Sequence, residues 1–187
     1  RKDSDEMLSL LTPIVKAFTT VNCDIATNAC MQVFGGHGYI HEHGMEQIAR
    51  DARIATLYEG TTGIQALDLL GRKVLLGTRG KCVRDFSRIM LRSAKAHWLA
   101  HGSIGRMARS TAKRAIEWNL LTLRIMRRVG KDRDLVGSAS VDYLMYSGYV
   151  MMAHFWARQA AVAQAFLRNG NGAESADFYR AKIQTAE

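Results

Sequence analysis

Three short segments decide how we interpret this sequence: QVFGGHGY at residues 32–39, RDARI at residues 50–54 and YEGTTGIQ at residues 58–65. The glycines of the first segment end a helical pattern, because glycine adopts backbone angles that other residues avoid. The third segment begins another helical pattern, in which Thr61 or Thr62 can cap the first turn. Taken singly, each segment is a common way to end or begin a helix.

On both sides of these segments, apolar residues recur at steps of three and four, which is the spacing of one helix face. Before the glycines the pattern predicts a helix over residues 12–34, with Pro13 in the first turn, where proline is tolerated. After them it predicts helices over residues 45–53 and 59–76. The predicted buried face of the first helix consists of Val15, Phe18, Val21 or Asn22, Ile25, Ala29 and Val33.

The best domain boundary is Gly77-Thr78-Arg79-Gly80, where the charge of the chain changes sign. The formal net charge is +9, but residues 1–75 contribute −2 and residues 76–187 contribute +11. Such an asymmetry indicates two units with different surroundings. We therefore predict a first helical domain at residues 1–76 and a basic second one at residues 77–187.

The second half of the chain repeats the helical pattern with longer elements. A single proline and nine methionines favour helices over sheets. The alternating steps of four and three also suit the seam of an antiparallel helix bundle. We predict an all-α fold, with helices here over residues 81–101, 107–129, 139–167 and 176–187.

The three cysteines, Cys23, Cys30 and Cys82, form no C-x-x-C pair. We interpret them as buried structural thiols of a reduced, cytoplasmic protein. The least charged stretch, residues 143–157, is shorter than the roughly 20 residues that span a bilayer, so we expect no membrane partner.

Taken together, in this order and at this spacing, the three segments resemble the acyl-CoA dehydrogenase family. Residues 94–98, 155–159 and 178–183 look like the extra C-terminal helical domain of longer bacterial members. The two resemblances cover nearly all of the chain. They imply an FAD-dependent oxidoreductase of fatty acid metabolism, in which residues 1–76 end the helical catalytic domain and residues 77–187 form a basic extension.

The resemblance implies a catalytic role for Glu59. In this family, the glutamate of the Tyr-Glu-Gly-Thr motif removes an α-proton from acyl-CoA while a β-hydride passes to the flavin, which gives a trans-2-enoyl-CoA. Gly60 matches the position beside the base that touches the acyl group. A carboxylate is a weak base in water, so we expect the bound substrate to exclude water and make it more basic.

The resemblance also implies a cofactor site and a set of partners. Thr61, Thr62 and Gly63 match the stretch that contacts FAD, although the family often has Gln at the place of Gly63. Gln32 and Val33 match a segment that reaches the adenosine part of the flavin across a subunit boundary. This implies a homodimer or homotetramer, acyl-CoA as substrate, and electron-transfer flavoprotein or a similar electron acceptor. We expect this chain alone neither to retain FAD nor to oxidise acyl-CoA.

A rival hypothesis comes from the basic second half. Lysines and arginines recur there at steps of three and four, so that they would line one side of a helix and could follow a phosphate backbone. On this hypothesis the chain is a DNA-binding or scaffold module derived from a flavoprotein. The residues of the basic stripe are Lys81, Arg84, Arg88, Arg92 and Lys95.

The remaining histidines and tryptophans do not require a ligand. His37, His41 and His43 with Glu42 have the residue types of metal ligands, but no further group stands at zinc-like spacing. We interpret them as parts of a polar loop and expect no metal. We also predict that the tryptophans occupy helical core positions: Trp98, Trp118 and Trp156.

Overall fold

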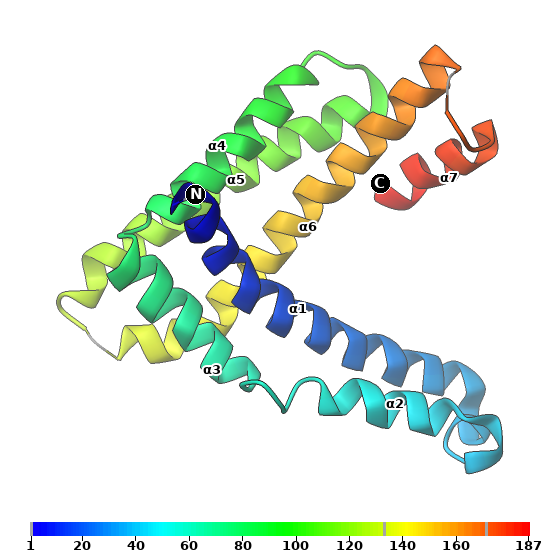
Figure 1. Cartoon of the computed structure of the whole chain (residues 1–187), viewed down its shortest axis with the longest axis horizontal. Helices are drawn as coiled ribbons and strands as arrows, with labels where there is room; N and C mark the ends of the chain where they lie inside the picture. Colours follow the sequence, from blue (N-terminus) through cyan, green and yellow to red (C-terminus); the bar gives the residue numbers. More distant parts are fainter. Residues whose placement is uncertain (1, 133, 171) are drawn as a thin grey trace. The chain divides into compact units, whose positions relative to one another are not determined.

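The computed structural model of the chain describes residues 2–132, 134–170 and 172–187, and the regular elements of these ranges are all helical (Figure 1). The predicted all-α fold is confirmed. The elements are α1 (Lys2–Phe34), η1 (Gly35–Gly38), η2 (His41–His43), α2 (Met45–Ile54), α3 (Thr62–Leu67), η3 (Asp68–Gly77), α4 (Lys81–Ala96), α5 (Gly102–Val129), α6 (Leu135–Asn169) and α7 (Ala176–Ala186).

Contacts divide the chain into two compact units. Unit 1 comprises Arg1–Cys82 and Met126–Gly148, and unit 2 comprises Val83–Ile125 and Tyr149–Glu187. The predicted boundary between residues 76 and 77 stays a prediction. No helix of the described residues is long and apolar enough to cross a bilayer.

In unit 1, α1 begins earlier than predicted, and Pro13 lies inside it instead of in its first turn. A proline inside a helix removes one backbone hydrogen bond, which is unfavourable. The ring of Pro13 is fully buried, which offsets part of that cost. The predicted start at residue 12 is wrong, because the helix already includes the buried Leu10, and the mostly charged residues 2–6 before it carry no apolar pattern that would mark its start.

The buried face of α1 is only partly the one predicted. Phe18 is buried, but Val15 is 55%, Ile25 is 59% and Val33 is 86% exposed. The same spacing places other residues toward the core: Leu10, Ile14 and Ala17. Neither cysteine of α1 is buried either, contrary to the prediction, while Cys82 is.

The predicted helix over residues 59–76 is a short α-helix, α3, followed by the π-helix η3. A π-helix has a wider turn than an α-helix. At the end of η3 the Thr78 amide accordingly donates to the carbonyl oxygen of Lys73, five residues back, at 3.1 Å. Leu69, Leu70 and Val74 are the buried residues of η3. The predicted start at residue 59 is wrong, because Glu59 has a left-handed φ that a helix cannot accommodate.

In unit 2, the core centres on Trp118 of α5, which is fully buried. The ring of Phe86 lies edge-on to it, with the centroids 6.1 Å apart. The other two tryptophans contradict the prediction, since Trp98 is 46% and Trp156 is 42% exposed. Trp98 also lies beyond the end of α4 at Ala96, because the chain turns there before α5.

Candidate functional site

The Tyr-Glu-Gly-Thr motif forms a tight turn in unit 1, between α2 and α3. The backbone angle φ is 56° at Glu59 and 91° at Gly60. A positive φ is uncommon for a residue with a Cβ atom, and such residues concentrate at functional sites. The turn ends at Thr61, whose extended backbone leads into α3. The Glu59 side chain therefore leaves the backbone just before the first turn of a helix.

Two side chains hold the backbone of this turn. The Lys16 ammonium, from the middle of α1, donates a hydrogen bond to the carbonyl oxygen of Gly60 at 2.5 Å. The Gln65 side-chain amide donates to the carbonyl oxygen of Glu59 at 2.9 Å. In addition, the Gln65 backbone amide donates to the carbonyl oxygen of Thr61 at 3.0 Å. These bonds fix the peptide groups on both sides of Gly60 and leave the Glu59 carboxylate unused.

The Glu59 side chain is exposed, and among the described residues its carboxylate makes no hydrogen bond or ion pair. Its neighbours Leu57 and Tyr58 are also about half exposed. A carboxylate becomes more basic when water is removed from it. The described residues provide the turn but not the dry surroundings, so the expected exclusion of water stays a prediction.

The start of α3 offers backbone donors. The first amides of a helix have no acceptor within the helix and suit a phosphate-bearing ligand. The predicted capping hydrogen bond is absent, because the Thr61 side chain accepts no bond from α3. A Cβ atom added at Gly63 would meet no other atom within 4 Å, so there is room at this position for a larger side chain. Thr62 and Gly63 are half-buried.

Gln32 and Val33 lie at the far end of α1, and both are exposed. Lys16, which reaches the turn, stands sixteen residues earlier in the same helix. At 1.5 Å per residue this corresponds to about 24 Å along the helix axis. The structure thus separates the predicted cofactor residues into two groups within one chain, one at the start of α3 and one at the end of α1.

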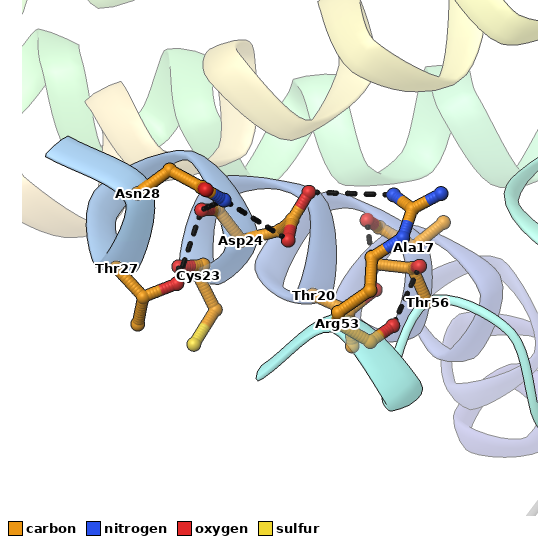
Figure 2. Close-up of polar contacts among 8 residues, drawn as sticks. All are labelled: Ala17, Thr20, Cys23, Asp24, Thr27, Asn28, Arg53 and Thr56. Carbon is orange, nitrogen blue, oxygen red and sulfur yellow. Dashed lines mark hydrogen bonds and ion pairs between the residues drawn. The ribbon is translucent and has the colours of Figure 1, made fainter. Parts of the chain in front are cut away.

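An open cleft of about 580 Å³ lies between α1 and α2, lined by Asp24, Asn28, Met31, Tyr39, Glu46, Ala49, Arg50 and Arg53. Figure 2 shows Asp24 pointing toward Arg53, with 3.3 Å between the carboxylate and guanidinium groups. The Asn28 side chain bonds to the same carboxylate at 3.3 Å. Three threonines shown there bond to carbonyl groups one turn earlier: Thr20, Thr27 and Thr56. Of these contacts, the Asp24–Arg53 ion pair ties α2 to α1, and the others are local bonds within three or four residues.

Arg50 lies on the same cleft and pairs with Glu46 at 3.0 Å. The ring of His41 contacts the same carboxylate at 3.1 Å. His37 and His43 meet edge to face, with centroids 5.2 Å apart. Among the described residues, no group of three or more histidines, cysteines and carboxylates is placed to hold a metal ion.

The basic stripe is only partly available to a ligand. Lys81 is half-buried and pairs with Glu6 at 2.7 Å. Arg88 pairs with Asp85 at 2.9 Å. A phosphate backbone would have to compete with both carboxylates. The stripe members that are exposed, with no ion pair in the described part of the chain, are Arg84, Arg92 and Lys95.

Asp68 and His154 have shifted pKa values, and neither residue is part of the Glu59 turn. A hydrogen bond from Arg72, opposed by partial burial and assisted by Lys73, holds the pKa of Asp68 below its usual value. In unit 2, burial lowers the pKa of His154, and the positive charge of Arg158 lowers it further. Asp68 is held in an ion pair and His154 is buried in the core of unit 2. We therefore interpret neither as a second reactive centre.

Sequence reasoning missed Lys16 and Asp24 as parts of this region, and it did not predict the ion partner of Arg53. Lys16 lies 44 residues before Gly60, and Arg53 lies 29 residues after Asp24. A lysine or an aspartate on an exposed helix face carries no local signal that identifies so distant a partner. Only the packing of α2 and α3 along α1 brings these groups together.

Comparison with known proteins gives two family matches that together span most of the chain. The family described as "Acyl-CoA dehydrogenase, C-terminal domain" matches residues 1–75. The family described as "Acetyl-CoA dehydrogenase C-terminal like" matches residues 83–187.

Individual relatives agree with these matches. The 3-methylmercaptopropionyl-CoA dehydrogenase of Ruegeria pomeroyi is 34% identical over the whole chain, which covers 31% of that protein. The broad-specificity linear acyl-CoA dehydrogenase FadE5 of Mycobacterium tuberculosis is 29% identical over 95% of this chain and 30% of its own length. A butyryl-CoA dehydrogenase of Syntrophomonas wolfei is 37% identical over 41% of the chain and 12% of its own length. The chain thus spans about a third of the length of the first two relatives.

Proposed function

The chain belongs to the acyl-CoA dehydrogenase family, and we propose that it is the helical end of an FAD-dependent acyl-CoA dehydrogenase in which Glu59 is the catalytic base. The observation that carries this proposal is the left-handed backbone of Glu59 within a turn held by Lys16 and Gln65. A residue is kept in an uncommon conformation only where its surroundings enforce it, which occurs mainly at functional sites.

The reaction we propose is the oxidation of an acyl-CoA to a trans-2-enoyl-CoA. Glu59 accepts the proton from the α-carbon of the thioester, and the electron pair of that C–H bond forms the new double bond. FAD, when bound, supplies the electron sink that takes the β-hydrogen as hydride. Gly60, next to the base, is the position at which we propose that the acyl group makes contact. General bases of this kind contribute about 10²–10⁴-fold to a rate.

Two groups of residues are suited to contact FAD. The amides at Thr62 and Gly63, just after Thr61, suit phosphate oxygens, and the open space at Gly63 leaves room for a large cofactor. Gln32 and Val33 stand about 24 Å away along α1, so we propose that they contact the flavin of a second subunit. The functional unit is then a homodimer or homotetramer, acting on acyl-CoA in the cytoplasm and passing electrons to electron-transfer flavoprotein or a similar acceptor.

The proposal is tested by Glu59→Gln in a full-length enzyme that carries this segment. We expect turnover of acyl-CoA to fall by at least about 10²-fold while FAD stays bound, since the amide keeps the shape of the carboxylate but cannot take the proton. Glu42→Gln, at another exposed glutamate, is the matched control and should leave the rate unchanged. A near-normal rate in Glu59→Gln would exclude this residue as the base.

A second measurement concerns the chain by itself. Because its two groups of flavin contacts lie far apart, we expect the purified chain to show no flavin absorbance and no dye reduction with acyl-CoA. Flavin that copurifies in stoichiometric amount would contradict this expectation.

A further inference from the structure

We infer that Lys16 and Gln65 are positioning residues, which hold the Glu59 turn so that its carboxylate is aimed correctly for proton transfer. The inference rests on the proposed role of Glu59 and adds two residues that act through the backbone of the base. Neither of them needs to touch substrate or cofactor. Both would act through consecutive carbonyl groups, those of Glu59 and Gly60.

The two donors approach the turn from different elements. Lys16 comes from α1, 44 residues away in sequence, and its ammonium reaches the carbonyl oxygen of Gly60 at 2.5 Å. Gln65 comes from the first turns of α3 and reaches the carbonyl oxygen of Glu59 at 2.9 Å. Rotation of the Glu59–Gly60 peptide group would break at least one of these bonds. The two bonds together therefore select one backbone conformation of the turn.

This conformation needs such support because Glu59 has a φ of 56°. A residue with a Cβ atom adopts left-handed angles with a steric penalty and keeps them only where other contacts compensate. Hydrogen bonds that involve a charged donor are stronger than neutral ones, so Lys16 is well suited to this task. Without the donors, the backbone at Glu59 would relax toward ordinary angles and move the carboxylate.

Gly60 and Gln65 are matched to each other. A Cβ atom at residue 60 would lie 2.9 Å from the side-chain nitrogen of Gln65, closer than such atoms approach. The φ of 91° at Gly60 is likewise unfavourable for any other residue. The absence of a side chain at residue 60 is therefore what lets the Gln65 amide reach the Glu59 carbonyl.

The consequence for catalysis follows from the geometry of proton transfer. A base must stand within hydrogen-bond reach of the proton that it removes, and a displacement of 1 Å can cost about 10²-fold in rate. Loss of a positioning residue should therefore lower kcat and leave the binding of acyl-CoA and FAD intact. A residue needed only for folding would instead change stability and cofactor content together with the rate.

The test uses Lys16→Met and Gln65→Leu in the full-length enzyme, each compared with the parent. We expect kcat to fall by about 10- to 100-fold, with KM, bound FAD and melting temperature unchanged. The primary isotope effect with α-deuterated acyl-CoA should rise, because proton transfer becomes slower relative to the other steps. Lys16→Arg keeps a charged donor and should recover most of the rate. Lys131→Met, at an exposed lysine between α5 and α6, is the matched control and should have no effect.

The outcomes separate this inference from the function on which it rests. If Glu59→Gln retains activity, the proposed function fails. If Glu59→Gln is inactive while Lys16→Met and Gln65→Leu keep a normal kcat, only the positioning role is overturned. It is also overturned if the two variants lose FAD or melt early in proportion to their loss of rate, or if Lys16→Arg is as slow as Lys16→Met.

Discussion

Mild acid should destabilise unit 2 through one buried imidazole, that of His154. This side chain lies on α6 and is only 1% exposed. Its Nδ1 atom has no hydrogen-bond partner within the part of the chain that the structure describes. Aromatic rings surround it, with the centroids of Phe86 and Phe155 at 5.8 and 5.5 Å. A charged imidazolium would be poorly solvated in this environment.

The charges around His154 act in the same direction as its burial. Burial lowers the pKa of His154, and the positive charge of Arg158 on the same helix adds to the effect. The small cavity beside it is lined by Ser93 of α4, by Thr111 of α5 and by His97, which follows α4, among other residues, and the described lining contains no carboxylate. No negative charge along that lining would therefore stabilise the protonated ring. We expect His154 to stay neutral in the folded chain at neutral pH.

The magnitude follows from the linkage between proton binding and folding. In the unfolded chain the imidazole titrates near its ordinary value of 6.5. Below that pH the unfolded state binds a proton that the folded state does not, so the free energy of unfolding decreases as the pH falls. At pH 5.5 the loss amounts to about 1.4 kcal/mol if the folded ring is still neutral. The free energy of unfolding therefore keeps its full value above pH 6.5. It falls progressively between pH 6.5 and the lowered pKa of the folded state.

The assay is thermal unfolding of the chain by circular dichroism, at pH 7.5 and at pH 5.5. A loss of about 1.4 kcal/mol should lower the melting temperature by about 3–6 °C for a chain of this size. In His154→Leu this component of the pH dependence should disappear, whatever the stability of the variant at pH 7.5. The exposed His101→Gln is the control and should keep the pH dependence of the parent. The reasoning is refuted if His154→Leu loses as much stability between the two pH values as the parent does.

Two further perturbations test the packing of unit 1 and the capping of α7. A Cβ atom at Gly148 would lie 2.2 Å from the Phe18 ring, so Gly148→Ala should destabilise unit 1 by about 1–3 kcal/mol. Urea unfolding measures this loss, and an unchanged midpoint would contradict the close approach. Ser175 caps α7 by accepting a hydrogen bond from the Phe178 amide at 3.2 Å, so Ser175→Ala should destabilise that helix by about 1 kcal/mol. Hydrogen exchange should then speed up in the α7 amides alone, and uniform protection across the variant and its parent would contradict the cap.

Periodicity predicted the existence and type of the helices because each has an apolar face repeated every three or four residues. It predicted α2 within one residue, since glycine precedes it and its apolar spacing is regular. It failed at the start of α1, where charged residues extend a helix that tertiary contacts support. It also failed at η3, because a π-helical turn accommodates one more residue than the spacing assumes.

The sequence predicted the residue types of the candidate site but not its backbone conformation. The Glu-Gly pair marks the turn, but nothing local indicates that Glu59 itself is left-handed, since glutamate has no preference for that conformation. The exposed Val33 and Ile25 show a related limit. An apolar stripe predicts that a face will be covered, not whether the covering residues lie within the same chain.

The exposure of the Glu59 side chain shows which part of the proposed site this chain provides. The described residues hold its backbone through Lys16 and Gln65, yet they leave its carboxylate in contact with water. An exposed carboxylate is too weak a base to deprotonate a carbon acid, because water stabilises its charge. On the proposed function, the low-dielectric surroundings would come from bound acyl-CoA, FAD and protein groups outside this chain. The orientation of the base and its dry surroundings would thus have separate sources, so that variants of the turn should alter kcat without altering the binding of acyl-CoA and FAD.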